Sequence, residues 1–161
     1  MSIQSIGGIL YQIINNEPYF FIMKRKALSG KIERIAPKGK VQPSEDPELT
    51  CVREISEETG MDINQLHIKT KLSGGVELKN MNFGKGATDK MINYFLVHYQ
   101  GEPDAVRIPD EEGLTGMYKW CTLTDVTNLV PYKDLRAVFR EAYEYLSRQT
   151  EKQRIFESIK I

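Results

Sequence analysis

Apolar residues along this chain recur in two spacings, one typical of strands and the other typical of helices. In the first half, strand-like runs cover residues 3–11 and 18–25, separated by Asn15-Asn16-Glu17-Pro18. Asn and Pro favour tight turns, so this pattern predicts a β-hairpin. A loop is expected to begin at Ser29-Gly30 and to continue through Pro37-Lys38-Gly39.

The second half continues with strands and then changes to helical spacing. Residues 65–72 and 91–99 are strand-like, and the second run is so nearly continuous in apolar residues that both its faces are expected to be buried. The glycine-rich, basic residues 74–90 predict a loop or an irregular hairpin. A short strand at 116–121 and a short helix near 123–129 follow. Apolar residues at helical spacing then predict a long C-terminal helix: Leu135, Val138, Phe139, Ala142 and Leu146.

This order of elements predicts an α/β fold. The chain has 161 residues, enough for one domain with a real core, and we expect a single domain over 1–161. The charged tail 149–161 either extends the last helix or frays. Because strands and helices are interleaved, helices on both sides of a mixed sheet are the natural packing.

A further helix is predicted over about 47–59, and it carries three glutamates on one face. Asp46 is a good N-cap, Pro47 suits the first helical position and Gly60 suits the C-terminal stop. At about 100° per residue the three glutamates fall within an arc of about 100°. They are Glu54, Glu57 and Glu58, and the opposite, core-facing side is predicted to carry Leu49, Val52 and Ile55.

The acidic face is unfavourable as structure alone. Glu54 repels Glu57 and Glu58 at i,i+3 and i,i+4, and the last two also lie where the helix dipole disfavours anions. A hard divalent cation, Mg²⁺ or Mn²⁺, would reverse these effects because such ions take carboxylate oxygens as ligands. A solvated acidic surface is the alternative that the carboxylates alone leave open.

The spacing of the surrounding residues resembles the box of the Nudix hydrolase family. The match consists of Gly39, Glu45, Arg53, Glu54, Ile55, Glu57, Glu58, Gly60 and Met61. Weaker similarity extends to Gly7-Gly8-Ile9-Leu10, Pro37-Lys38-Gly39 and Tyr94-Phe95-Leu96. Trp120 followed by Tyr132-x-x-Leu135 is similar to the branch that hydrolyses dinucleoside polyphosphates and diphosphoinositol polyphosphates.

The resemblance implies a Nudix α/β/α sandwich and a Mg²⁺-dependent pyrophosphohydrolase. In that family the principal metal ligands would be Glu54, Glu57 and Glu58, completed by a backbone carbonyl that we assign to Lys38. Arg53 could brace a carboxylate, and Glu45 could pair with Arg53 or reach the metal through water. A purely structural cap and ion pair remain equally open for these two residues.

The general base is the least defined part of the expected site. Relatives often place a glutamate where this chain has Leu114, and a two-residue insertion would bring Glu112 to that position, with Glu111 beside it. Glu54 or Glu58 could act as the base instead. His67 and His98 lie in strand-like segments and are not favoured as catalytic groups.

Five residues are predicted to contact the substrate. By position, Lys38 and Lys40 suit phosphate binding, and Lys90, Tyr94 and Tyr132 match positions that relatives use near the substrate, although core packing explains Tyr94 as well. Two departures from the branch stand out: Arg34 replaces a frequent Trp, and Ser44 replaces the usual glycine.

The distribution of charge limits the kinds of partner that are expected. The formal net charge is zero, yet Lys24–Lys40 is strongly basic and Glu45–Glu58 strongly acidic, which suits a polyphosphate held between cations. Two solvated blocks that merely attract one another are the alternative. Nothing extends the basic track, so nucleic acid is not expected as a partner, apart from an RNA 5′ end.

The chain also lacks the features of an exported or membrane protein. No apolar run approaches the ~20 residues of a membrane span, the start does not resemble a signal peptide, and Cys51 and Cys121 form no metal or redox motif. A cytoplasmic location is expected, with no membrane partner. Monomer and homodimer both stay open.

These observations lead to a functional hypothesis with alternatives. The favoured one is a Mg²⁺-dependent hydrolase of a nucleoside diphosphate linked to another group, with a dinucleoside polyphosphate such as diadenosine tetraphosphate as substrate. Hydrolysis of diphosphoinositol polyphosphates or of the RNA 5′ pyrophosphate uses the same chemistry. A non-catalytic Nudix-like module that binds a nucleotide belongs to a different class, and such modules usually lose a glutamate of the box.

Overall fold

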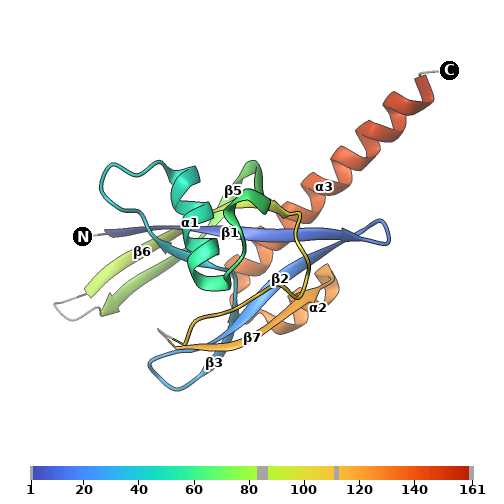
Figure 1. Cartoon of the computed structure of the whole chain (residues 1–161). Coiled ribbons are helices and arrows are strands. Elements are labelled where there is room, and N and C mark those ends of the chain that lie inside the picture. Colours follow the sequence, from blue (N-terminus) through green and yellow to red (C-terminus); the bar gives the residue numbers. More distant parts are fainter. Residues whose placement is uncertain (1, 83–86, 111–112, 160–161) are drawn as a thin grey trace.

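The computed structural model describes residues 2–82, 87–110 and 113–159, which form a mixed sheet between helices (Figure 1). The strands are β1 (Ser2–Ile14), β2 (Glu17–Lys26), β3 (Ile32–Ile35), β4 (Lys38–Lys40), β5 (Leu66–Asn82), β6 (Ala87–Tyr99) and β7 (Leu114–Cys121). The helices are α1 (Pro47–Thr59), α2 (Leu123–Leu129) and α3 (Lys133–Ile159), with a 3₁₀ turn η1 (Ile63–Gln65) after α1.

The predicted hairpin of β1 and β2 is confirmed, and it opens into a fork. Asn15 and Asn16 have positive φ angles of 53° and 65°, as a two-residue type I′ turn requires. The two strands pair only near this turn, from Ile14 opposite Glu17 to Tyr11 opposite Phe20. Farther along, β4 pairs with β1 and β3 pairs with β2, so β1 and β2 diverge (Figure 1).

Two of these strands correct the prediction of a loop. Residues 29–39 were expected to be irregular, but they contain β3 and begin β4. Both strands are short, and β4 contains only Lys38, Gly39 and Lys40, which carry no apolar alternation. Their pairing with the diverging arms of the fork stabilises them, and local sequence does not report such pairing.

The remaining strands make the sheet mixed, as expected. β1 runs parallel to β6, whereas β5 pairs antiparallel with β6 and β7 pairs antiparallel with β2. β5 and β6 form a long hairpin whose register shifts three times, which confirms the irregular-hairpin alternative for much of residues 74–90.

Each face of the sheet buries its own apolar cluster. On one side α1 packs on the sheet through Cys51 and Ile55, both fully buried. On the other side α2 and α3 cover the sheet, and the ring of Phe139 meets Phe20 edge-on at 5.6 Å. The α/β/α arrangement expected from the sequence is therefore confirmed.

The ends of α1 match the prediction, and so do Ile55 and Val52 of its core-facing side, but Leu49 does not. Asp46 caps the first turn, Pro47 begins the helix, and Gly60 ends it with a φ of 73°. Leu49 was expected in the core and is 54% exposed. Thr50 and Thr59 are buried instead, because the hydroxyl of Thr59 donates to the carbonyl of Ile55 and needs no water.

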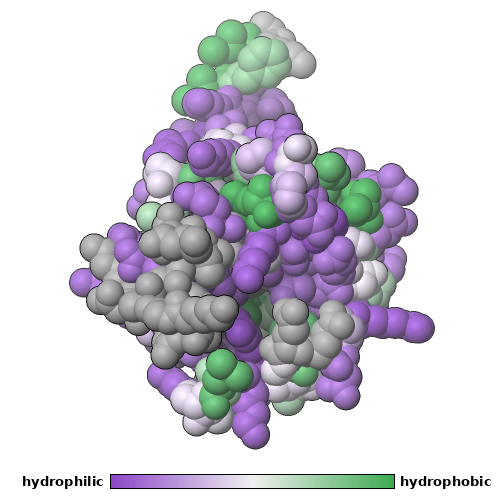
Figure 2. Space-filling model, turned by 90° about the vertical axis from the view of Figure 1, so that its left-hand side faces the viewer, coloured by the Kyte–Doolittle hydropathy of each residue, from purple (hydrophilic) through white to green (hydrophobic). Residues whose placement is uncertain are grey.

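The last helix outruns the sheet that it covers. α3 has 27 residues, or about 40 Å at 1.5 Å per residue, and its far half projects from the body (Figure 1). Apolar side chains gather at its tip (Figure 2), where Ile155, Phe156 and Ile159 are all more than half exposed. The described part of the 149–161 tail is thus a helical extension. None of the described helices is both long and apolar enough to cross a membrane.

Removing this extension should leave the rest of the fold intact. Every described residue after Leu146 is exposed, so a chain ended after Gln149 loses no core contact. We expect its unfolding free energy to stay within about 0.5 kcal/mol of the full chain in urea titrations. Phe139→Ala, from the buried half of the same helix, should cost about 3–5 kcal/mol. A large loss on truncation would mean that the extension contacts the body.

Candidate functional site

A cavity of about 430 Å³, lined by both acidic and basic side chains, lies where β4 passes beside α1. α1 contributes Glu54, Glu57 and Glu58 to its wall, so the three glutamates predicted to share a helix face do line one hollow. β4 contributes Lys38 and Lys40, and the remaining wall comes from other strands. We call this hollow the acidic cavity.

Gly39 lets the helix approach β4 closely. A Cβ atom added to Gly39 would lie 1.9 Å from the Cδ of Glu54, so any other residue would displace that carboxylate. On the same strand the backbone N–H of Lys38 donates to Glu58 at 2.8 Å. The short strand β4 thus positions two of the three carboxylates.

Arg53 binds three carboxylates at once. Its Nε and Nη2 donate to Glu45 at 2.6 and 2.8 Å, and its Nη1 donates to Glu54 at 2.9 Å and to Glu57 at 3.2 Å. The expected pairing of Glu45 with Arg53 is therefore present. Glu45 also accepts from Thr50, and together these bonds, that of Arg53 foremost, lower the pKa of Glu45 to about 2.

The carboxylates that line the acidic cavity are oxygen ligands of the kind that a hard divalent cation prefers. In this structure Glu54 and Glu57 accept hydrogen bonds from Arg53. All three carboxylates supply oxygen ligands, and the buried hydroxyl of Ser5 faces the same cavity without a partner among the described residues. Within those residues no three acidic, histidine or cysteine side chains converge closely enough to hold an ion. Arg53 engages one oxygen each of Glu54 and Glu57, so their other oxygens could take an ion once the three carboxylates move closer together.

A cationic cluster separates the acidic cavity from a second one. Arg25, Lys38 and Lys90 line both cavities. Burial, and then the neighbouring charges of Lys90 and Arg25, lower the pKa of Lys38 to about 7. The Nε of Arg25 is buried without a hydrogen-bond partner among the described residues. Cations gathered in this way repel one another, and an anion bound between them would relieve the repulsion.

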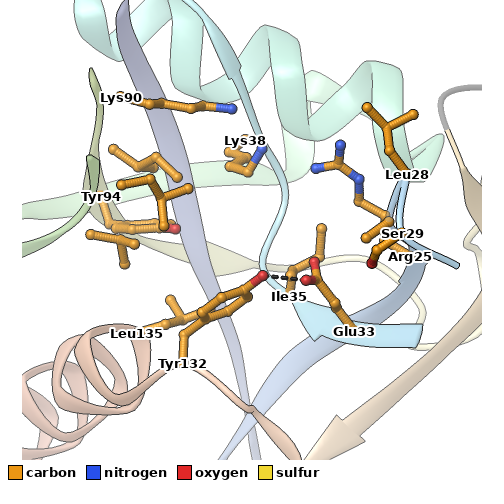
Figure 3. A pocket seen from close by; sticks show the side chains of 14 residues that line it. Arg25, Leu28, Ser29, Glu33, Ile35, Lys38, Lys90, Tyr94, Tyr132 and Leu135 are labelled. Atoms are coloured by element: carbon orange, nitrogen blue, oxygen red, sulfur yellow. Dashed lines mark hydrogen bonds between the residues drawn. The ribbon is translucent and has the colours of Figure 1, made fainter. Parts of the chain in front are cut away.

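The second cavity, of about 360 Å³, is mainly apolar (Figure 3). We call it the apolar cavity. Its walls include Ile35, Ile92, Leu135 and the ring of Tyr132, while Tyr94 is only 2% exposed and borders the space. The hydroxyl of Tyr132 donates a hydrogen bond to Glu33 of β3. A planar, partly polar group would fit beside these rings.

The structure brings together most residues predicted for the site. Lys38, Lys90, Tyr94 and Tyr132 line the apolar cavity, and Lys40 lines the acidic one. Glu112 lies outside the described residues, although Leu114 lines the acidic cavity. The roles assigned to these side chains stay predictions.

Two charged lining residues were not predicted for the site. Arg25 and Glu33 both lie within the basic stretch Lys24–Lys40, and neither was assigned a role there. The signal was present: Arg25 and Glu33 are directly opposed across β2 and β3, a pairing that becomes visible once β3 is recognised as a strand.

The family-level comparison identifies the class of this protein. The model of the NUDIX domain matches residues 8–146, most of the chain, so the chain belongs to the Nudix family and to its pyrophosphohydrolases. The fold agrees: a Nudix hydrolase from Listeria monocytogenes superposes with a TM-score of 0.72 at 14% identity, over 90% of this chain and 94% of that one.

Similar proteins include members of the branch that the sequence suggested. A bis(5′-nucleosyl)-tetraphosphatase (asymmetrical) of Sus scrofa is 27% identical, over 91% of this chain and 97% of its own. The crystal structure of the Ap4A hydrolase of C. elegans is similar, with a TM-score of 0.67 at 25% identity, over 91% and 99%. An RNA pyrophosphohydrolase of Rickettsia canadensis is 23% identical over 78% of this chain and 81% of its own.

The bond between Arg53 and Glu45 should make stability depend on acid pH. The folded-state pKa of Glu45 is about 2 and lies below the ordinary value of 4.5. Its stabilising contribution is therefore fully present above about pH 4.5 and is lost as the pH falls towards 2. Glu45→Gln should be less stable at pH 7 and should lose less stability across this window, as measured by urea unfolding. Glu144→Gln, an exposed change on α3, should keep the parent pH profile.

Proposed function

We propose that this protein hydrolyses a pyrophosphate linkage in a dinucleoside polyphosphate such as diadenosine tetraphosphate, with Mg²⁺ held by Glu54, Glu57 and Glu58. One observation carries the proposal: the acidic and the apolar cavity meet at the cationic cluster of Arg25, Lys38 and Lys90. A molecule with a base at one end and a chain of phosphates beyond it has the complementary order of groups.

The character of each cavity determines which part of the substrate it would bind. The apolar cavity would take a nucleoside, with Tyr132 as an aromatic wall. Lys38, Lys90 and Arg25 would neutralise and orient the phosphates next to it, which reduces the charge that repels an attacking water. Lys40, which is exposed at the edge of the acidic cavity, would contact phosphates farther along.

The carboxylates would serve the reaction itself. A divalent cation, which Nudix hydrolases generally use, would neutralise phosphate oxygens and favour ionisation of the attacking water. Arg53 would hold Glu54 and Glu57 at fixed positions, and the backbone carbonyl of Lys38 would complete the ligand set. We assign proton acceptance to Glu112, with Glu54 or Glu58 as the alternative base.

The alternative substrates make less use of the apolar cavity. A diphosphoinositol polyphosphate has no planar base to pack beside Tyr132. An RNA 5′ end would place its first base there, and the Rickettsia relative gives this alternative its support. A binding module without turnover would still bind a nucleotide in both cavities.

We place the enzyme in the cytosol, where both buried cysteines stay as free thiols.

Removing one acid should separate these alternatives. With Mg²⁺ we expect turnover of diadenosine tetraphosphate to exceed that of ADP-ribose, nucleoside triphosphates and a diphosphoinositol phosphate. Glu57→Gln should lower kcat by about 100-fold or more, because a lost metal ligand costs several kcal/mol at the transition state. Circular dichroism should show an unchanged fold, and Glu144→Gln should keep full activity. Binding without turnover in the parent protein would favour a sensor and contradict catalysis.

Removing Lys90 from the cationic cluster should stabilise the protein and weaken substrate binding. Lys90→Met deletes a like charge next to Lys38, so we expect the unfolding free energy to rise by at least a few tenths of a kcal/mol in urea. The same change should raise KM for diadenosine tetraphosphate severalfold, since a phosphate contact is lost. Lys133→Met, on the exposed start of α3, should alter neither quantity. A stable variant with an unchanged KM would place the phosphates elsewhere.

A further inference from the structure

We infer that Glu33 reads the base of the substrate and makes guanine the preferred base in the apolar cavity, over adenine. The inference rests on the proposed function in one respect, that a nucleoside occupies this cavity. It goes further by naming the base and the side chain that selects it.

Glu33 is placed to meet a base rather than the phosphates. It lies on β3, is half-buried and lines the apolar cavity, but it does not line the acidic one. Figure 3 shows its carboxylate beside the hydroxyl of Tyr132, on the far side of the cavity from Lys90. A phosphate chain lying against the cationic cluster would therefore direct its base towards Glu33.

The carboxylate of Glu33 is oriented by a hydrogen bond and not by an ion pair. The hydroxyl of Tyr132 donates to its Oε1, which fixes the rotamer of the carboxylate. Arg25 is its cross-strand partner, yet the guanidinium points towards Lys38 (Figure 3), and no ion pair joins Arg25 to Glu33 among the described residues. A carboxylate has about four acceptor positions, so this one keeps lone pairs for a ligand.

These acceptors match one purine and not the other. On its Watson–Crick edge guanine presents N1–H and N2–H₂, two parallel donors at the spacing of the two oxygens of a carboxylate. Adenine presents the N6 amine and an N1 lone pair, and that lone pair would face a carboxylate oxygen. A well-placed bidentate contact discriminates between bases by about 5-fold to 150-fold in general, and rejection is stronger where a buried polar group is left unpaired.

The competing explanation is that Glu33 merely ties β3 to the chain before α3 through Tyr132. Such a tie would shape the cavity and so affect all nucleotides alike. A base reader would instead change the ratio between nucleotides. Glu33→Gln distinguishes the two, because its amide oxygen can still accept from Tyr132 while its amide nitrogen now donates.

The test is nucleotide binding without metal, so that it does not depend on turnover. In EDTA, isothermal titration calorimetry would measure Kd for GDP, IDP and ADP. We expect GDP to bind at least tenfold more tightly than ADP, with IDP between them because hypoxanthine keeps N1–H and lacks the N2 amine. Glu33→Gln should abolish or reverse the GDP-to-ADP ratio, since a glutamine can pair with the N6 and N1 of adenine. Glu144→Gln should leave the ratio unchanged.

Two results would overturn the inference. One is an equal affinity for GDP and ADP, or no measurable binding of either. The other is a guanine preference that survives in Glu33→Gln. Tyr132→Phe is a second check, because loss of the bond that orients Glu33 should reduce the ratio while the aromatic wall remains.

Activity assays then separate this inference from the proposed function. Comparing kcat/KM for diguanosine and diadenosine tetraphosphate should reproduce the binding ratio. If both are cleaved equally and Glu33→Gln changes nothing, the proposed function stands and the base reader fails. If neither is cleaved but GDP binds selectively through Glu33, the reverse holds.

Discussion

The site depends on the repulsion between like charges and on the groups that restrain it. Glu45, Glu54 and Glu57 would repel one another around α1 if Arg53 did not donate to all three. Because that guanidinium is itself anchored by a bidentate bond to Glu45, it is held in place before any ligand binds. Arg53 thus offsets the repulsion along an acidic helix face.

Like charges also repel one another in a cluster of cations, near the fork of β1 and β2. Lys38, Lys90 and Arg25 come from three different strands and meet between the cavities. Burial and neighbouring cations lower the pKa of Lys38 to about 7, so part of the folding free energy is given up to keep this cluster together. Functional sites often concentrate such strain, because the ligand that relieves it is bound more tightly as a result.

The sequence predicted the parts that depend on local patterns. The caps of α1, the hairpin turn at Asn15 and Asn16 and the buried strand β6 follow from short-range rules, and the glutamates of the box could be placed on one helix face. Prediction from the sequence failed where long-range contacts decide the local structure. β3 and β4 form because the fork offers them partners, and Leu49 is exposed because the helix turns Cys51 and Ile55 towards the sheet. Glu33 could not be recognised before its strand and Tyr132, 99 residues away, were brought together.

The cations shared by the two cavities would also set the distance between a bound base and the glutamates of α1. Since Arg25, Lys38 and Lys90 belong to both cavities, a base seated against Tyr132 fixes how many phosphates fit before the chain reaches the glutamates of α1. In the proposed reaction the bond that breaks is then counted from the bound base and not from the middle of the molecule. A substrate with two nucleosides would need only one of them in the apolar cavity, because the distance to the glutamates is set from the bound end.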